Sequence, residues 1–451
     1  MNVLVLNGSP SGKDSITLQT VLYIEKLFPH ISFQTLDVSQ RIRQYEKDFS
    51  VCEEALKKAD LILFCYPVYT FLVPSQLHRF IELMKEHGEI LKGKYATQLT
   101  TSKHFYDTTA HQFIEDNCDD MGLKYIKGLS ADMEDLMKEK GQKEAEAFFH
   151  YVIWNMENGC YEPPAVRETH KELKAASAAN EEAVHKTGTC VIVADYDENS
   201  VRLKSMIERF EKKVPMHTKT VNLREFPFAG GCLGCFNCAA DGRCIYKDGF
   251  DSFLRENIQT ADATVYAFEI KDHSMGYRFK LYDDRQFCNG HRTVTMGKPV
   301  AYLIDGELSE ERNLLNVIEA RAEVGGNFLA GVACSENDPD HETDQMAARL
   351  GYAVLHQYQP PKSFWGVGGL TIFRDLIYQM QGLMKADHEF YKKNGFYDSF
   401  PQKHKAKTAA MYLVGGMMRN QKLRKKIGGR MTEGMVMPYK AVIGKAGKKK
   451  R

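Results

Sequence analysis

The chain has 451 residues, of which 43% are hydrophobic and 26% are charged, and its formal net charge is +1. This length exceeds one ordinary domain and the composition is that of folded globular proteins, so we expect two or three domains rather than a disordered or fibrous chain. No apolar run approaches the roughly 18 residues that a membrane span needs, and the N-terminus lacks a signal-peptide pattern, so we expect a cytoplasmic protein.

Buried strands and amphipathic helices alternate through residues 1–157. Short apolar runs predict five strands, at residues 3–6, 31–36, 61–65, 96–101 and 123–126. The helical spacing of apolar residues predicts helices near residues 18–24, 77–83 and 140–156. Alternation of this kind is typical of a parallel sheet with helices on both faces.

The same alternation restarts after a linker at residues 158–186, which contains Pro163 and Pro164. Five more strands are predicted, at residues 190–194, 217–221, 263–268, 300–304 and 328–332, with helices near 201–210 and 250–258. The repetition predicts a second α/β domain over residues 187–358, which arose by internal duplication. The expected fold is therefore two tandem, doubly wound, five-stranded parallel sheets.

Residues 359–451 are expected to form a mainly helical C-terminal extension that packs on the second domain or mediates dimerisation. From Lys403 to the C-terminus this extension carries fifteen Lys and Arg residues and one acid, Glu433. We expect the basic segment to be solvated or to lie on the acidic remainder of the chain; an anionic partner is the alternative. Beyond Tyr412 and Tyr439, aromatic residues do not interleave with the basic ones, so no nucleic-acid partner is expected.

Four of the eleven cysteines lie within thirteen residues: Cys232, Cys235, Cys238 and Cys244, spaced C-x2-C-x2-C-x5-C. The odd total and the lack of an export signal argue against a disulfide framework. Four thiolates this close together are typical of a [4Fe–4S] cluster, which is our first interpretation. Zinc more often takes two separated C-x2-C pairs, and it stays open as an alternative, as does a loop without metal.

Residues 7–17 join the first predicted strand to the first predicted helix, where open α/β sheets bind ligands. Gly8 and Gly12 permit a tight turn, and the hydroxyl groups that follow, with the free N–H groups of the helix start, suit a phosphate. Neither the Walker A pattern nor G-x-G-x-x-G is present. A hydroxyl-rich loop of this kind suits the single phosphate of FMN, and we expect Asp14 to cap the helix.

Two more loops at the same sheet edge carry polar and aromatic residues. The third strand ends at Tyr66-Pro67-Val68-Tyr69, and the fourth ends at Thr101-Ser102 before Lys103-His104-Phe105-Tyr106. An aromatic ring and backbone amides in such loops can lie along a flat heterocycle. The three loops together predict a flavin site.

These residues give the first domain a resemblance to the flavodoxin-like NAD(P)H-dependent FMN reductases and quinone reductases. The matching pieces are Gly8-Ser9-Pro10 with its hydroxyl-rich helix start, and Pro67-Val68-Tyr69. The resemblance implies that both domains have the flavodoxin-like fold and that the first binds FMN. The cofactor-binding residues that it and the loops imply are Ser9, Ser11, Ser15, Ile16, Thr17, Pro67, Val68, Tyr69, Thr70, Thr101 and Ser102.

The second domain resembles the iron–sulfur flavoproteins of the same superfamily, which carry a compact cysteine motif after the second strand. Its first loop departs from the flavin pattern, because residues 194–200 contain no glycine and three acids, Asp195, Asp197 and Glu198. Carboxylates would repel a phosphate dianion. We therefore do not expect the second domain to bind its own FMN there.

The predicted function is that of an FMN-dependent NAD(P)H oxidoreductase that reduces a small aromatic or quinone-like acceptor, or a redox protein, with electrons also passing to an iron–sulfur cluster held by the four cysteines. Hydride transfer requires no acid–base residue, but His104 and Tyr106 are predicted on the acceptor side, with His104 as a proton donor. The alternatives are a non-enzymatic electron carrier between protein partners and a metal-dependent interaction module. The choice between NADH and NADPH stays open, and a homodimer is expected by analogy.

Overall fold

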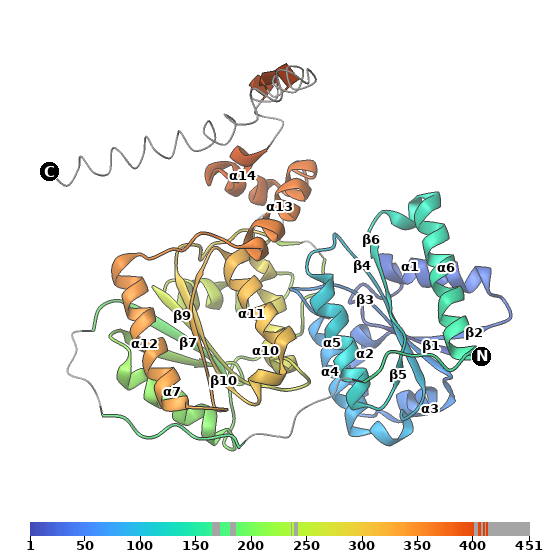
Figure 1. Ribbon diagram of the computed structural model, residues 1–451, viewed down its shortest axis with the longest axis horizontal. Helices are drawn as coiled ribbons and strands as arrows, with labels where there is room; N and C mark the ends of the chain where they lie inside the picture. The colour runs from blue at the N-terminus through green and yellow to red at the C-terminus, as the bar shows by residue number, and fades with distance from the viewer. Residues whose placement is uncertain are drawn as a thin grey trace, which may run out of the picture. The chain divides into compact units, whose positions relative to one another are not determined.

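The computed structural model describes residues 1–164, 172–180, 186–235, 237–238, 242–400, 405–406, 409–410 and 412–413. Residues Met1–Phe390 form one compact unit, and Tyr391–Arg451 form a second. The first unit contains two parallel sheets, which we call the first and second domains (Figure 1). The doubly wound arrangement predicted from the sequence is confirmed.

The sheet of the first domain has the strand order β2-β1-β3-β4-β5, with one further strand, β6, that pairs with β4. All of these pairings are parallel. The strands are β1 (Asn2–Asn7), β2 (Ser32–Leu36), β3 (Leu61–Pro67), β4 (Tyr95–Ser102), β5 (Lys124–Tyr125) and β6 (Leu129–Asp132). The five predicted strands are present, and the prediction missed β6, which is short and carries polar residues.

The sheet of the second domain has the order β11-β10-β9-β7-β8, which is the same winding as β5-β4-β3-β1-β2. Its strands are β7 (Thr189–Asp195), β8 (His217–Asn222), β9 (Ala263–Glu269), β10 (Pro299–Asp305) and β11 (Phe328–Cys334). All five correspond to predicted strands. The shared winding is consistent with the internal duplication, although this strand order is common among doubly wound sheets.

Helices cover both faces of each sheet (Figure 1). In the first domain they are α1 (Ile16–Leu27), α2 (Val38–Tyr45), α3 (Ser50–Lys58), α4 (Ser75–Glu86), α5 (Asp107–Asp120) and α6 (Glu139–Glu157). In the second they are α7 (Val201–Lys213), α9 (Phe250–Phe253), α10 (Gly276–Arg285), α11 (Arg312–Gly325) and α12 (Pro339–His356). The prediction missed six of these helices: α2, α3 and α5 in the first domain and α10, α11 and α12 in the second.

The two domains share one hydrophobic core. Helix α4 packs against α10, and α5 packs against α11, so these four helices lie between the two sheets (Figure 1). The buried rings of Phe80 and Phe113 in the first domain belong to the same apolar cluster as Phe279 and Ile318 in the second. Separate clusters lie under α1 and α6 and under α7 and α12. Burial of a continuous apolar layer holds the two domains together.

One local structure occurs in both domains directly after the third strand of the winding. The Tyr69 turn (residues 69–72) is closed by reciprocal backbone hydrogen bonds between Tyr69 and Leu72, and the Lys271 turn (residues 271–274) by the same pair of bonds between Lys271 and Ser274. The two central residues have positive φ in each case: 43° and 70° at Thr70 and Phe71, and 51° and 60° at Asp272 and His273. None of the four is glycine, so each turn holds a strained backbone.

The C-terminal extension begins with α13 (Phe364–Gln379), which packs against α11. The ring of Phe373 also stacks on Phe105 of the first domain, with 4.1 Å between centroids. Packing on the second domain was one predicted role of the extension, and α13 shows it; dimerisation stays a prediction. The next helix is α14 (Lys385–Lys393). The basic segment from Lys403 onward lies almost wholly outside the described residues.

No helix among the described residues combines the length and apolar character of a membrane span. The predicted boundaries at residues 157, 187 and 359 are close to the end of α6, the start of β7 and the end of α12. Much of the linker, residues 165–171 and 181–185, lies outside the described part of the chain.

An ionic contact fixes the Lys271 turn on the first domain. His273 lies between two carboxylates, with Nε2 at 2.9 Å from Asp120 of α5 and Nδ1 at 2.9 Å from Glu311. Burial alone would lower the pKa of His273, but the hydrogen bonds to Asp120 and Glu311 outweigh it and raise the pKa to about 9. The imidazolium form is therefore the folded-state form at neutral pH.

We expect His273→Gln to flatten the pH dependence of stability in the alkaline range. Because folding raises the pKa of His273 from about 6.5 to about 9, the protonated ring adds up to about 3 kcal/mol to the free energy of unfolding. This contribution is complete below pH 6.5 and is lost as the pH rises through 9. Urea unfolding at pH 6, 8 and 10 measures it. The exposed His217, changed to Gln, is the control, and equal pH profiles for wild type and His273→Gln would contradict the assignment.

Candidate functional site

The loop after β1 is held by Asn7, the last residue of the strand. The Nδ2 of Asn7 donates to the carbonyl of Gly12 at 3.1 Å and to Asp37 at 3.0 Å, and its Oδ1 accepts from the backbone N–H of Ser9 at 3.2 Å. Gly12 has φ 56°. These bonds fold residues 8–14 into a compact loop directly before α1.

The start of α1 offers two free backbone donors. Ser15 is the N-cap, and its hydroxyl accepts from Leu18 N, so the predicted cap at Asp14 is wrong. Among the hydrogen bonds of the described residues, none is donated by the backbone N–H of Ile16 or Thr17. Such groups at a helix N-terminus favour an anion. The loop therefore fits a phosphate, with the exposed Ser11 beside it.

The predicted residues of the β1 and β4 loops come together. The Oγ1 atoms of Thr17 and Thr101 are 2.6 Å apart, and both side chains are buried. Ser102 follows at the end of β4, and its hydroxyl accepts from the backbone N–H of His104 at 2.9 Å. Parallel strands bring these loops to one sheet edge, as the sequence predicted.

The Tyr69 turn follows Pro67 and Val68 at the end of β3, and α10 of the second domain binds it. Lys280 donates to the carbonyl oxygen of Tyr69 at 3.0 Å, and Asp284 accepts from the hydroxyl of Thr70 at 2.9 Å. Burial raises the pKa of Tyr69 well above its usual value, and the nearby charges of Cys232 and Asp284 add to the shift. The Tyr69 hydroxyl therefore stays protonated.

The Tyr69 turn also contacts the cysteine loop, which comprises residues 232–244. A Cβ placed on Gly234 would overlap the Tyr69 hydroxyl oxygen, so only glycine allows this approach. Gln76 of α4 donates to the carbonyl of Cys232 at 3.3 Å. Two features that lie far apart in the sequence are thus adjacent in space, which the sequence did not show.

Within the cysteine loop, the sulfur atoms have polar neighbours. The backbone N–H of Gly234 donates to Cys232 Sγ at 3.5 Å, and Cys238 Sγ donates to the carbonyl of Phe287 at 3.0 Å. Burial raises the pKa of Cys232 to about 12 and that of Cys238 to about 11. These thiols need a cation to ionise them, and a coordinating metal supplies that charge.

Four cysteine thiolates can bind either a [4Fe–4S] cluster or a single zinc ion. In the described part of the chain, the one group of three or more metal-binding atoms within 4.8 Å of one another is His78, Glu82 and Asp272. Tetrahedral zinc with Zn–S near 2.3 Å would hold its sulfurs about 3.8 Å apart. In a [4Fe–4S] cluster each thiolate binds a different iron, so the sulfurs lie farther apart. A donor set of four cysteine sulfurs fits a [4Fe–4S] cluster by its chemistry, and zinc stays open as the alternative.

The group at His78 does not need a metal to balance its carboxylates. Asp272 pairs with Lys85 at 2.9 Å, and Glu82 pairs with Arg79 at 2.8 Å. Although burial raises the pKa of Asp272, the contact with His78, whose Nε2 lies 3.8 Å from the carboxylate, and the charge of Lys85 outweigh it and lower the pKa to about 2. We assign this group to the contact between the domains.

His104 lines an open cavity of about 660 Å³ together with Ser130 and residues of α6. Its Nδ1 is 2.8 Å from Asp107 Oδ2, and Ser130 donates to the same oxygen. Although burial raises the pKa of Asp107, the bonds from Ser130 and His104 lower it below its usual range. The side chain of His104 is 51% exposed, so a small molecule can reach it.

Tyr106, predicted beside His104, has a different environment. Its hydroxyl donates to the carbonyl of Trp365 in α13, and its ring centroid lies 4.6 Å from that of Phe71. This contact could not be read from the sequence, because α13 is more than 250 residues away. Of the two predicted acceptor-side residues, His104 is the one that lines a cavity.

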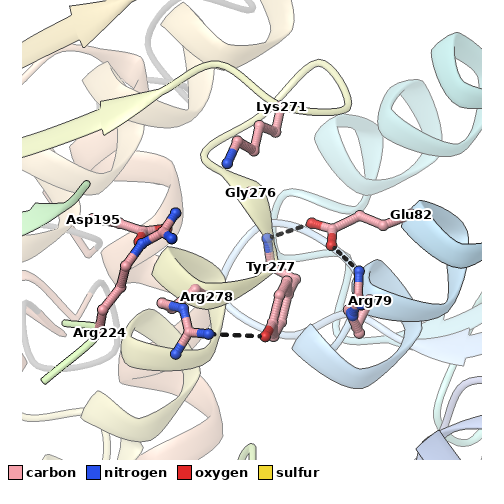
Figure 2. Close-up of a pocket in the computed structure, with 8 residues that line it drawn as sticks. All are labelled: Arg79, Glu82, Asp195, Arg224, Lys271, Gly276, Tyr277 and Arg278. Carbon is pink, nitrogen blue, oxygen red and sulfur yellow. Dashed lines mark hydrogen bonds and ion pairs between the residues drawn. The ribbon is translucent and has the colours of Figure 1, made fainter. Parts of the chain in front are cut away.

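The corresponding edge of the second domain is closed by ion pairs. Arg224, which follows β8, donates to Asp195 and Asp197 at 2.8 Å each, so the acidic loop binds a cation of its own chain. A cavity of about 230 Å³ remains there, which is below the roughly 300 Å³ at which ligand pockets begin. Figure 2 shows its lining residues, with Glu82 bonded to Arg79 and to the backbone of Tyr277. This supports the expectation that the second domain binds no FMN.

Three further residues complete the site, and none of them was predicted to have a role in it. Lys280 and Asp284 are fully buried in α10, where polar residues interrupt an amphipathic helix, and that interruption was the available signal. Cys288 is buried beside the cysteine loop, and its carbonyl accepts from Arg255 together with that of Gly242. A lone cysteine carried no such signal.

Residues 1–115 match the family described as NADPH-dependent FMN reductase, which confirms the resemblance of the first domain. A curated relative, named iron-sulfur flavoprotein, from Archaeoglobus fulgidus, is 27% identical over 194 residues. That alignment covers 41% of this chain and 84% of the relative.

Solved structures with partial similarity include an NADPH-quinone reductase from P. pentosaceus, 15% identical, covering 34% of this chain and 97% of the other at a TM-score of 0.28. Another is the NAD(P)H:acceptor oxidoreductase FerB from Paracoccus denitrificans, 17% identical, covering 35% and 95% at a TM-score of 0.29. These scores are too low to support a functional argument.

We expect Gly234→Ala to separate the cysteine loop from Tyr69. The new methyl group would overlap the Tyr69 hydroxyl, so overpacking of about 1–3 kcal/mol should add to the strain of alanine at φ 61°. Gly249→Ala is the matched control, because Gly249 has φ 76° but no atom within 4 Å of its Cβ position. Urea unfolding and iron content after anaerobic reconstitution measure the effect, and equal losses in both variants would show that strain alone acts.

Proposed function

We propose that the whole chain passes electrons from NAD(P)H through FMN in the first domain to a [4Fe–4S] cluster in the second. The match of residues 1–115 to the family described as NADPH-dependent FMN reductase supports the flavin-dependent step. The cluster would be held by Cys232, Cys235, Cys238 and Cys244. The curated relative named iron-sulfur flavoprotein supports this proposal.

The observation that carries the proposal is the contact between the Tyr69 turn and the cysteine loop. Tyr69 lies against Gly234, and Gln76 bonds to the carbonyl of Cys232. Electron transfer requires that the two redox groups be close, and these contacts bring the predicted flavin-binding turn and the predicted cluster ligands together. The duplication then has a function, since each domain contributes one group.

FMN, when bound, accepts a hydride as two electrons, and a [4Fe–4S] cluster passes electrons singly. The chain itself supplies binding and orientation. The free N–H groups of Ile16 and Thr17 and the hydroxyl of Ser11 would hold the phosphate, and Pro67, Val68, Tyr69 and Thr70 would flank the ring system. Thr101 and Ser102 close the same edge from β4.

His104 is proposed to deliver a proton to the reduced acceptor. Asp107 bonds to its Nδ1 and so fixes the orientation of the imidazole ring. The cavity that His104 lines has the volume of a small-molecule site. A small aromatic or quinone-like acceptor is proposed to bind there, and a redox protein is the alternative electron acceptor at the cysteine loop.

Anaerobic stopped-flow mixing with NADH and with NADPH tests the proposal. The purified, reconstituted protein should hold about one FMN and four irons per chain, and NAD(P)H should bleach the flavin absorbance. Cys235→Ser should lose iron and keep the flavin, because Cys235 lies on the exposed part of the loop. Flavin that binds but does not bleach would indicate the non-enzymatic electron carrier, and colourless protein would reject both redox functions.

We expect Ser11→Glu to reduce FMN affinity at least tenfold. The new carboxylate would stand beside the phosphate and repel it, whereas Ser11→Ala removes only one hydroxyl and should have a small effect. Flavin fluorescence titration measures the affinity. Ser50→Glu, at the start of α3, adds the same charge at another exposed helix start and is the control. Unchanged FMN affinity in Ser11→Glu would place the phosphate elsewhere.

We expect His104→Gln to slow acceptor reduction about 10- to 100-fold, because a positioned general acid contributes in this range or above. Bleaching of the flavin by NAD(P)H and FMN affinity should stay as in wild type, since the residue acts after hydride transfer. Half-reaction rates with a benzoquinone measure it, with Asp107→Asn to test the orienting bond. Equal acceptor rates in wild type and His104→Gln would remove His104 from the mechanism.

A further inference from the structure

The two domains bind each other's turns by a reciprocal arrangement. The Tyr69 turn and the start of α4 in the first domain are bound by α10, and the Lys271 turn and the start of α10 in the second domain are bound by α4. Because α4 and α10 occupy the same place in the two windings, this contact has approximate two-fold symmetry. The residues that make it differ between the two halves.

At the Tyr69 turn, one carboxylate makes three bonds. Asp284 accepts from the hydroxyl of Thr70 at 2.9 Å and from the backbone N–H of Ser75 at 2.8 Å, and it also pairs with Lys280. Lys280 in turn donates to the carbonyl of Tyr69 at 3.0 Å. Both charged side chains are 0% exposed. The turn with positive φ at Thr70 and Phe71 is thereby fixed by a buried ion pair of the other domain.

Arg321 of α11 adds a contact to the same turn. Its guanidinium lies 5.9 Å from the ring centroid of Phe71, and it pairs with Asp283, the neighbour of Asp284. Every residue from Tyr69 to Phe71 therefore has a partner in the second domain. No other turn at this edge of the first sheet has such a set of partners among the contacts of the described residues.

At the Lys271 turn the corresponding bonds are closer to solvent. Glu82 of α4 accepts from the backbone N–H of Tyr277 at 3.0 Å, which matches the bond from Ser75 to Asp284. Lys85 pairs with Asp272, which occupies the place of Thr70. The side chains of Glu82 and Lys85 are 15% and 21% exposed. At the adjoining sheet edge of the second domain, Arg224 bonds to Asp195 in the loop that corresponds to the phosphate loop of the first domain.

We propose that Asp284, with Lys280, is a positioning device through which the second domain sets the geometry of the flavin-flanking turn of the first domain. Glu82 makes the equivalent bond on the side where we expect no flavin, so we expect it to serve the domain contact alone. This inference rests on the proposed function, because it concerns FMN bound at the Tyr69 turn. Neither residue was among those that the sequence pointed to as flavin ligands.

The mechanism is one of pre-organisation. The strained backbone of residues 69–72 would relax if its polar anchors were lost, and FMN would then have to order the turn on binding, which lowers its affinity. A bond to a buried carboxylate is among the stronger hydrogen bonds in proteins. The protein would thus bind FMN through a turn that another domain holds in place.

The matched pair Asp284→Asn and Glu82→Gln tests the proposal in the full, reconstituted chain. We expect Asp284→Asn to raise the Kd for FMN about tenfold and to change the visible circular dichroism of the bound flavin, because the ring would lie against a different turn. Glu82→Gln should leave both unchanged. Thermal unfolding of the FMN-free proteins reports how much each variant weakens the domain contact.

A second pair covers the case in which Asp284→Asn does not fold, since it leaves Lys280 buried without a full charge partner. Thr70→Val removes only the hydroxyl that bonds Asp284 and should raise the Kd for FMN, whereas Thr70→Ser keeps the hydroxyl and should restore it. Wild-type affinity and dichroism in Asp284→Asn, or in Thr70→Val, would overturn the positioning role and leave the proposed function intact. Failure of wild type to bind FMN would instead reject the proposed function.

Discussion

The buried ion pair between Lys280 and Asp284 is the constraint on which the site depends. Both charges are fully removed from water, and removal of one partner from such a pair costs about 3–5 kcal/mol. Replacement of both by apolar residues of similar size is often neutral for stability. A charged pair at this position is therefore better explained by what it binds, which is the backbone of the Tyr69 turn, than by the stability that it adds.

The two domains share one winding but present sheet edges with opposite properties. At the edge of the first domain, free backbone N–H groups and hydroxyls follow β1. At the edge of the second domain, Arg224 neutralises the acidic residues at and after the end of β7. The shared winding and the shared turn geometry were kept, because they hold α4 against α10 and α5 against α11. The segment between the second and third strands also differs, being α2 and α3 in the first domain and the cysteine loop with α9 in the second.

The sequence predicted the parts of the molecule that depend on local pattern. Ten of the strands follow from apolar runs, and the loops after β1, β3 and β4 follow from their position at strand ends. The sequence could not predict contacts between residues far apart, such as Thr70 with Asp284 or Tyr69 with Gly234, because they depend on how the two domains pack. The predicted helix cap fell on Asp14, because Asp14 and Ser15 are adjacent capping residues and only the backbone geometry shows that Ser15 is the cap.

Joining the two domains in one chain changes how the two proposed redox groups meet. In an assembly of separate subunits, the contact between a flavin-binding turn and a cysteine loop would depend on protein concentration. Here the linker makes the contact intramolecular, so its effective concentration is set by the chain and not by dilution. The continuous apolar core then holds the pair in one geometry. Mutations on the Asp284 side of the α4–α10 contact should therefore affect flavin binding and cluster retention together, whereas mutations under α12 should affect stability alone.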